Sequence, residues 1–175
     1  MNKQAWHKGE PSFDRVKKAA IKLVADHARP IQRVSGIPYP GEILDWTTAS
    51  ADEFFPEPND LMGPSQIYWM TDEMFVHLLP ILLLIPLIRP HSDLCNEVLK
   101  RTCEMNGKLT ELLPSTYFQV VRDALALLKK VHPLPTTDQL EWRQLEEVAL
   151  DFDHRPCEGE MIELVEKLLD AHTND

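Results

Sequence analysis

Glycine is scarce in this chain, with 6 among 175 residues. A loop that cradles phosphate needs several glycines, because its backbone must approach the ligand closely. The chain also has no Gly-x-Ser-x-Gly elbow, no Walker loop, no dinucleotide-binding fingerprint and no His-Glu-x-x-His sequence. These absences exclude the common nucleotide-binding and hydrolytic motifs, and no catalytic residue is predicted.

Cysteine is scarce as well, with 3 residues and no compact spacing pattern. An odd number of scattered cysteines does not build a disulfide framework, and it fits a reducing compartment. The N-terminal sequence MNKQAWHKGEPSFDR has neither the apolar core nor the small-residue cleavage site of a signal peptide. We therefore expect a cytoplasmic protein.

Long hydrophobic runs are also missing. The apolar run Leu78–Ile88 is closed by His77 and Arg89, and it is far shorter than the roughly 20 apolar residues that a membrane-spanning helix needs. We expect a soluble protein that does not enter a membrane.

Alternating polar and apolar residues, the mark of a half-buried strand, do not form a convincing run anywhere in the chain. Apolar residues recur instead at helical spacing in six segments, at about 13–29, 72–88, 93–106, 116–131, 137–149 and 158–172. We predict an all-α fold in a single globular domain over residues 1–175. Residues 30–70, which carry six prolines, predict a long loop packed on the helices, and residues 136–175 predict an acidic helical pair.

Capping residues predict where these helices begin and end. The predicted N-caps are Ser12, Thr71, Ser92 and Ser115, the predicted capping boxes are Ser50 with Glu53 and Thr136 with Gln139, and the predicted C-terminal stop is Gly107. The segment that follows Thr71 is apolar on every side, which is typical of a helix at the centre of a core. Pro80 predicts a kink or break in this central helix.

Charge is distributed unevenly along the chain, whose net charge is −10. The last forty residues hold twelve acids and three bases, and a dense basic stripe typical of nucleic-acid binding is missing. Concentrated negative charge speeds the encounter with a basic partner. The acids proposed for such a contact are Glu146, Glu147, Asp151, Asp153 and Glu158. The alternative is an acidic surface that serves only solubility.

A second group of acids is interleaved with aromatic residues in the long loop. Its members are Trp46, Asp52, Glu53 and Phe54. Aromatic anchors surrounded by charge are typical of interface hot spots, so this group is a second candidate contact. The same pattern also fits a loop that is held against its own core.

Two groups offer other chemistry. Asp151, Asp153, His154 and Cys157 are ligand types that zinc accepts, but they lack a second Cys/His pair at finger or ribbon spacing. An acidic turn between two helices is the simpler interpretation, and no metal or cofactor is predicted. A pocket near His77, His91 and Cys95 is the alternative that would support a small enzyme or a small-molecule-binding protein.

The central helix resembles a signature in a bacterial family of unknown function. In that family an aromatic or apolar residue precedes Thr/Ser-Pro-Glu-Ala-Phe-Arg-Tyr-Tyr-Leu-Pro-Ala-Phe-Leu. The positions that match are Trp69, Thr71, Glu73, Phe75, Leu79, Pro80 and Leu83, whereas Asp72, Met74, Val76, His77 and Leu78 depart from the pattern. The similarity covers about fifteen residues. It implies a small cytoplasmic protein of the immunity or accessory type, found near secreted toxins.

These observations favour a non-catalytic protein-binding protein. The most concrete expectation is an immunity or inhibitor protein that neutralises a basic bacterial toxin or effector domain through its acidic surface. No nucleic-acid or membrane partner is expected, and the sequence leaves the oligomeric state open.

Overall fold

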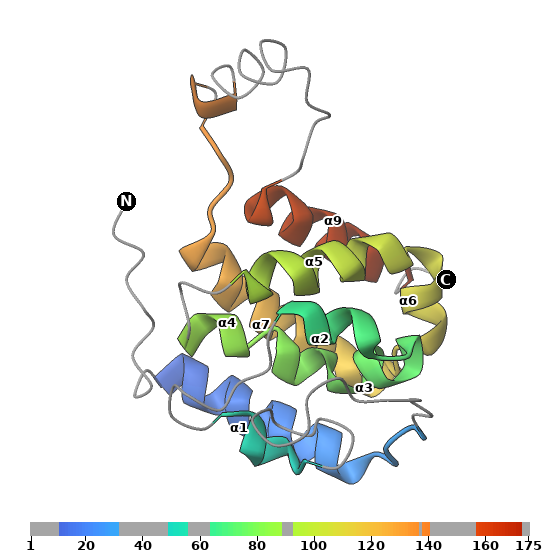
Figure 1. Cartoon of the computed structure of the whole chain (residues 1–175). Coiled ribbons are helices and arrows are strands. Elements are labelled where there is room, and N and C mark those ends of the chain that lie inside the picture. Colours follow the sequence, from blue (N-terminus) through green and yellow to red (C-terminus); the bar gives the residue numbers. More distant parts are fainter. Residues whose placement is uncertain are drawn as a thin grey trace.

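A computed structural model of the chain describes residues 11–31, 49–55, 64–88, 93–136, 138–140 and 157–172. Within these residues the protein is all-α, as the sequence predicts, and no residue lies in a strand. The elements are α1 (Pro11–Asp26), η1 (Ala51–Phe54), α2 (Pro64–Trp69), α3 (Asp72–Leu82), α4 (Ile85–Ile88), α5 (Leu94–Met105), α6 (Gly107–Leu112), η2 (Ser115–Tyr117), α7 (Phe118–Val131) and α9 (Glu158–His172) (Figure 1).

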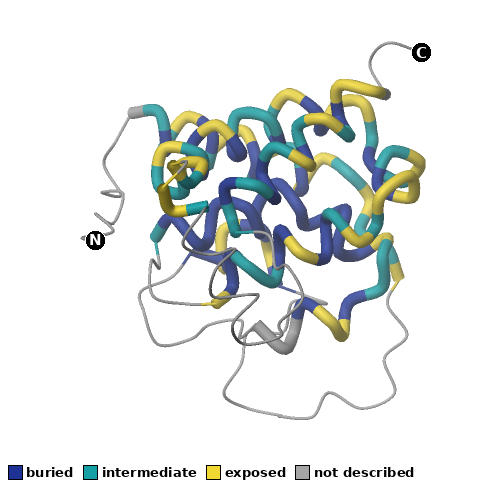
Figure 2. The backbone as a smooth tube through the Cα atoms, turned by 90° about the horizontal axis from the view of Figure 1, so that it is seen from above, coloured by how far each residue is buried: buried dark blue, intermediate teal, exposed yellow. Residues whose placement is uncertain are grey.

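The helices are arranged around α3. Helix α1 packs against α3 and α7 on one side, and α9 packs against α5 and α7 on the other (Figure 1). The buried apolar residues form one cluster. The backbone segments that carry buried residues run through the centre of the molecule (Figure 2). Among the described residues, no helix is long and apolar enough to cross a membrane.

Helix α3 is the central apolar helix that the sequence predicts. Its residues from Met74 to Leu82 are all buried. Thr71 caps it, because its hydroxyl oxygen accepts a hydrogen bond from the Met74 N–H at 3.2 Å. Of the predicted kink or break at Pro80, the break is wrong: α3 continues through Pro80 to Leu82, and a turn at residues 83–84 then separates it from α4.

Several predicted helix ends are shifted. Helix α1 begins at Pro11, so Ser12 is inside the helix; proline suits the first helical turn because its φ is already helical. Helix α5 is preceded by Asp93, one residue after the predicted cap Ser92, which is outside the described residues. Ser115 begins the short helix η2 rather than capping α7 directly.

The end of α5 is set by Asn106 instead of Gly107. Asn106 has a φ of 43°, in the left-handed region, and Gly107 already belongs to the next helix, α6. Asparagine tolerates this conformation better than most residues other than glycine. The chain therefore gains a helix at residues 107–112 that the sequence analysis did not predict.

The two predicted capping boxes are present. In the first, the Ser50 N–H donates a hydrogen bond to Glu53 Oε2 at 2.5 Å ahead of η1. In the second, the Thr136 N–H donates to Gln139 Oε1 at 2.9 Å and the Gln139 N–H donates to the Thr136 hydroxyl oxygen at 3.4 Å. Residues 64–69 of the predicted long loop also form a helix, α2.

Helix α9 spans the predicted residues 158–172, and its start is anchored by a close backbone contact. A Cβ atom at Gly159 would lie 2.7 Å from the Pro133 carbonyl oxygen. Glycine is required here because no side chain fits between the first turn of α9 and the backbone that follows α7.

Candidate partner-binding surface

The acids predicted at the C-terminal end fall into two groups. Glu158 is the first residue of α9 and is half-buried. Glu146, Glu147, Asp151 and Asp153 are outside the described residues.

The acids further along α9 form ion pairs with α7. Lys129 Nζ lies 2.8 Å from Glu166 Oε2 and 3.9 Å from Glu163 Oε1. The Arg122 guanidinium lies 2.7 Å from Asp170 Oδ1. Hydrogen bonding to Glu166 raises the pKa of Lys129. These pairs join α9 to α7. They also neutralise part of the C-terminal negative charge that the sequence predicts to bind a basic partner.

The predicted aromatic–acidic group of the long loop is divided in the structure. Asp52 and Glu53 are exposed, whereas Phe54 is 0% exposed and belongs to the core. Hydrogen bonds from the Ser50 hydroxyl and N–H lower the pKa of Glu53. The Phe54 ring therefore stabilises η1 against the helices instead of forming an exposed anchor. Trp46 is outside the described residues.

Cys157 stands at the start of α9. Its N–H donates a hydrogen bond to Glu160 Oε2 at 2.7 Å, and its carbonyl oxygen accepts from the Met161 N–H at 3.0 Å. The Glu160 side chain folded back onto the Cys157 N–H is one half of a capping box, and the bond from Met161 is the first backbone bond of the helix. Asp151, Asp153 and His154 are outside the described residues, and the described part of the chain has no group of three potential metal ligands.

The structure places His77 against Tyr117. His77 is 6% exposed, and its Nδ1 lies 3.4 Å from the Tyr117 hydroxyl. The Tyr117 ring in turn meets the His27 ring edge-on, with centroids 4.9 Å apart. Burial is the main cause that lowers the pKa of His77 to about 4, and it raises the pKa of Tyr117 to about 12. Both groups are therefore neutral near pH 7.

The other members of the predicted pocket are placed differently. Cys95 is buried on α5, which packs mainly against α9 and α2, whereas His77 lies on α3 and is turned toward η2. His91 is outside the described residues. The contact that the structure provides for His77 is therefore the His77–Tyr117–His27 cluster.

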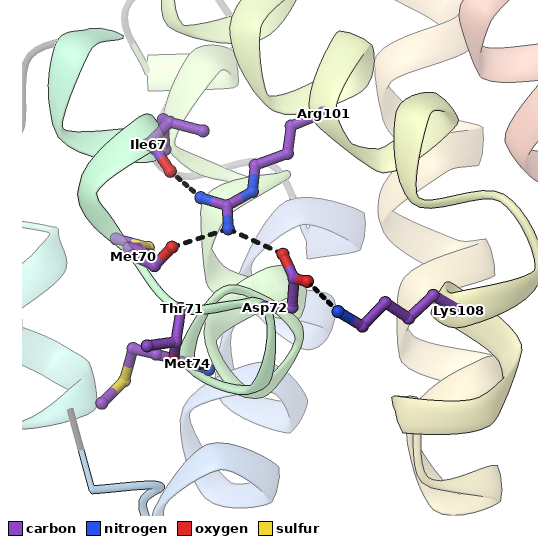
Figure 3. Close-up of polar contacts among 7 residues, drawn as sticks. All are labelled: Ile67, Met70, Thr71, Asp72, Met74, Arg101 and Lys108. Atoms are coloured by element: carbon purple, nitrogen blue, oxygen red, sulfur yellow. Dashed lines mark hydrogen bonds and ion pairs between the residues drawn. The ribbon is translucent and has the colours of Figure 1, made fainter. Parts of the chain in front are cut away.

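A buried arginine organises the opposite side of α3. Arg101 of α5 donates hydrogen bonds to the carbonyl oxygens of Ile67 and Met70, the latter at 2.7 Å, at the C-terminal end of α2 (Figure 3). Its guanidinium also lies 3.1 Å from Asp72 Oδ1 and 4.6 Å from the centroid of the Phe75 ring. A cation suits this position because the carbonyl end of a helix carries partial negative charge.

Asp72 is shared between two cations. Its second carboxylate oxygen accepts a hydrogen bond from Lys108 of α6, while the first faces Arg101 (Figure 3). Hydrogen bonding to Lys108, supported by Arg101, lowers the pKa of Asp72. One carboxylate therefore connects the start of α3 to both α5 and α6.

Two large aromatic side chains are exposed on α2, the short helix whose C-terminal carbonyl oxygens Arg101 binds. Tyr68 is 51% exposed and Trp69 is 52% exposed, at the end of α2. The Tyr68 hydroxyl donates a hydrogen bond to Glu97 Oε2 of α5. This bond, with added repulsion from Glu97 and Glu104, raises the pKa of Tyr68 to about 12. We call Tyr68, Trp69, Glu97 and Glu104 the aromatic–acidic face.

Sequence reasoning missed this face. It treated Tyr68 and Trp69 as part of a loop that packs across the helices, whereas Ile67 and Met70 are the buried members of this stretch. The helical spacing of Ile67 and Met70 was the available signal. The contacts from Glu97 and Arg101 come from far along the chain, so no local pattern reports them.

Comparison of the chain with protein-family models, with curated proteins and with solved structures found no match.

Proposed function

We propose that this protein is a non-catalytic binding protein that recognises a basic protein partner through the aromatic–acidic face. The observation that carries the proposal is the exposure of the neighbouring residues Tyr68 and Trp69, together with the Tyr68 hydroxyl that is bonded to Glu97 and lies within electrostatic reach of Glu104. Tyrosine and tryptophan are enriched among the residues that dominate binding energy at protein interfaces.

The distribution of charge supports a basic partner. The net charge is −10, which favours encounter with a positively charged protein. On α9 part of the acidic charge is neutralised by Lys129 and Arg122. By contrast, no described residue forms an ion pair with Glu97 or Glu104. The aromatic–acidic face is accordingly our first choice of contact, and Glu146, Glu147, Asp151 and Asp153 remain a second predicted contact.

The most concrete form of the proposal is an immunity or inhibitor protein that neutralises a bacterial toxin in the cytoplasm. It is supported by the resemblance of the segment around Thr71 and Pro80 to a family of that type. It is also supported by the acidic composition, since a cationic toxin that grips phosphate can be blocked by an acidic surface. A stoichiometric complex with one cognate protein is the expected behaviour.

The first experiment is capture of the partner by the tagged full-length protein, followed by calorimetry on the purified pair. We expect one partner bound at one-to-one stoichiometry, with affinity that falls as salt is raised because the contact is electrostatic. Trp69→Ala should weaken binding by about 30-fold, since truncation of a central interface aromatic costs about 2 kcal/mol.

The matched control is Leu164→Ala. Leu164 of α9 is 45% exposed, so this change removes a similar exposed apolar group from a different surface, and binding should be unchanged. If Trp69→Ala bound normally while charge reversal at Glu146, Glu147 and Asp151 abolished binding, the contact would be the C-terminal acids. A well-folded sample that captures no stoichiometric partner would contradict the proposed function as a whole.

A further inference from the structure

The fold already contains one guanidinium held between an aromatic ring and a carboxylate. Arg101 lies 4.6 Å from the centroid of the Phe75 ring while its Nη2 atom lies 3.1 Å from Asp72 Oδ1. Arginine suits this arrangement because its planar group can stack on a ring and donate hydrogen bonds from its edge at the same time.

The aromatic–acidic face presents the same chemical groups to solvent. Tyr68 and Trp69 are each about half exposed, Glu97 is half-buried beside the Tyr68 hydroxyl, and Glu104 is exposed on the same side of α5. Residues 97 and 104 are seven positions apart, close to two helical turns, so the two carboxylates project in similar directions.

Glu97 retains acceptor capacity in this arrangement. The Tyr68 hydroxyl is hydrogen-bonded to Oε2, and a carboxylate has about four acceptor sites on its two oxygens. The positive charge of Arg101 beneath the face is already paired with Asp72, and Lys108 shares the same carboxylate. Lys100, exposed on α5 between Glu97 and Glu104, carries one positive charge against their two negative charges. The net charge of these groups is therefore negative, which is complementary to a cation.

We propose that the aromatic–acidic face is the binding site for an arginine side chain of the protein partner. The guanidinium stacks on the exposed ring surface of Tyr68 or Trp69 and donates hydrogen bonds to Glu97 and Glu104. The Tyr68–Glu97 hydrogen bond holds the carboxylate in place for this contact. The inference rests on the proposed function for the identity of the partner as a protein, but its chemistry can be tested without that partner.

The test is a titration of the full-length protein with acetylated, amidated hexa-arginine, followed by ¹H–¹⁵N spectra. The indole signal of Trp69 is assigned with the Trp69→Phe variant, which separates it from the other three tryptophans of the chain. We expect the Trp69 signal to shift on titration, with hexa-lysine binding at least about fivefold more weakly, because an ammonium is a point charge and cannot stack and donate in parallel.

Two further variants test the carboxylates. Glu97→Gln and Glu104→Gln should each weaken hexa-arginine binding by about threefold to tenfold, since each removes a charge-assisted hydrogen bond. Glu111→Gln, an exposed acid on α6, is the control and should bind normally. The folded state of each variant is verified from the same spectra.

Any of three results would overturn the proposed arginine-binding site. They are a Trp69 signal that does not move, hexa-lysine that binds as tightly as hexa-arginine, or a Glu97→Gln variant that binds hexa-arginine as tightly as the parent protein. These results are independent of the proposed function. If hexa-arginine binds the face but the protein captures no partner, the proposed function is refuted and the arginine-binding site is retained. If a captured partner binds the Trp69→Ala and Glu97→Gln variants normally, the partner-binding function is retained and the arginine-binding site is refuted.

Discussion

At the scale of single residues, His77 is held in a setting that opposes its positive charge. The groups that face it are the Tyr117 hydroxyl from η2 and, at longer range, Arg29 and His27, which follow α1. Burial is the largest of the effects that lower its pKa to about 4, and the two neighbouring bases add to it. Neutral His77 is therefore part of the stable folded state.

The pH dependence of stability follows from this shift. The pKa of His77 is about 4 in the folded protein against a reference value of 6.5, so the unfolded chain takes up the proton first as the pH falls. The contribution of neutral His77 to the free energy of unfolding is complete above pH 6.5. It is lost as the pH falls toward 4, by on the order of 3 kcal/mol. Urea unfolding measured across this interval should show the loss.

A matched pair of variants isolates the contribution of His77. His77→Gln keeps a polar group beside Tyr117 but does not titrate, so it should flatten the fall in unfolding free energy across this interval. His132→Gln, a half-buried histidine at the end of α7, should leave that fall in place. The same fall in His77→Gln as in the parent protein would show that other groups cause it.

Arg101 is the residue whose loss should cost most among the described charged groups. Replacement by methionine leaves the Ile67 and Met70 carbonyl oxygens without their donor and removes one of the two cations on Asp72. We expect Arg101→Met to lower the free energy of unfolding by about 3 kcal/mol, as for other broken buried charge networks.

Denaturant unfolding measures this cost, and Lys108→Met is the control. Lys108 contacts the same carboxylate but is exposed, so its removal should change stability little. Equal effects of the two variants would mean that the shared ion pair with Asp72, rather than the capping of α2 by Arg101, is what stabilises the region.

At the scale of helices, the start of α9 depends on a residue without a side chain. A Cβ at position 159 would lie 2.7 Å from the Pro133 carbonyl oxygen and 3.0 Å from that of His132. Because both atoms belong to the backbone, α9 or the segment after α7 must shift to accept it. Gly159→Ala should therefore lower the free energy of unfolding by about 1–3 kcal/mol.

The control for this substitution is Gly107→Ala at the start of α6. Nothing lies within 4 Å of a Cβ placed there, and alanine favours a helix over glycine, so stability should be unchanged or rise by up to about 1 kcal/mol. Thermal unfolding of the two variants gives the comparison. A Gly159→Ala protein as stable as Gly107→Ala would mean that α9 tilts away without cost.

Helix prediction succeeded where local signals are strong. The bounds of α9 and the Thr71 cap of α3 follow from helical periodicity and a capping hydroxyl, both of which act within a few residues. The short helices α2 and α6 were missed. The C-terminal end of α2 is satisfied by Arg101, more than thirty residues later in the chain, so its stability depends on a contact that no local pattern contains.

At the scale of the whole molecule, charge that is separated along the chain is brought together in space. Lys129 and Arg122 of α7 meet acids of α9, and Arg101 and Lys108 meet Asp72. The negative charge of the C-terminal region is thus partly used to hold the helices together. On the aromatic–acidic face the Glu97 carboxylate lies beside the exposed Tyr68 ring and forms no ion pair with a described residue, which is why this face is the proposed contact.

The sequence by itself determined the helical class, the burial of the segment after Thr71 and the bounds of α9, because each depends on residue spacing over a few turns. The tertiary structure decided which aromatic rings are buried and which are exposed, with Phe54 inside and Tyr68 and Trp69 outside. It also decided which acids are paired with bases. Both outcomes depend on residues that are distant in sequence and become neighbours only when the helices pack.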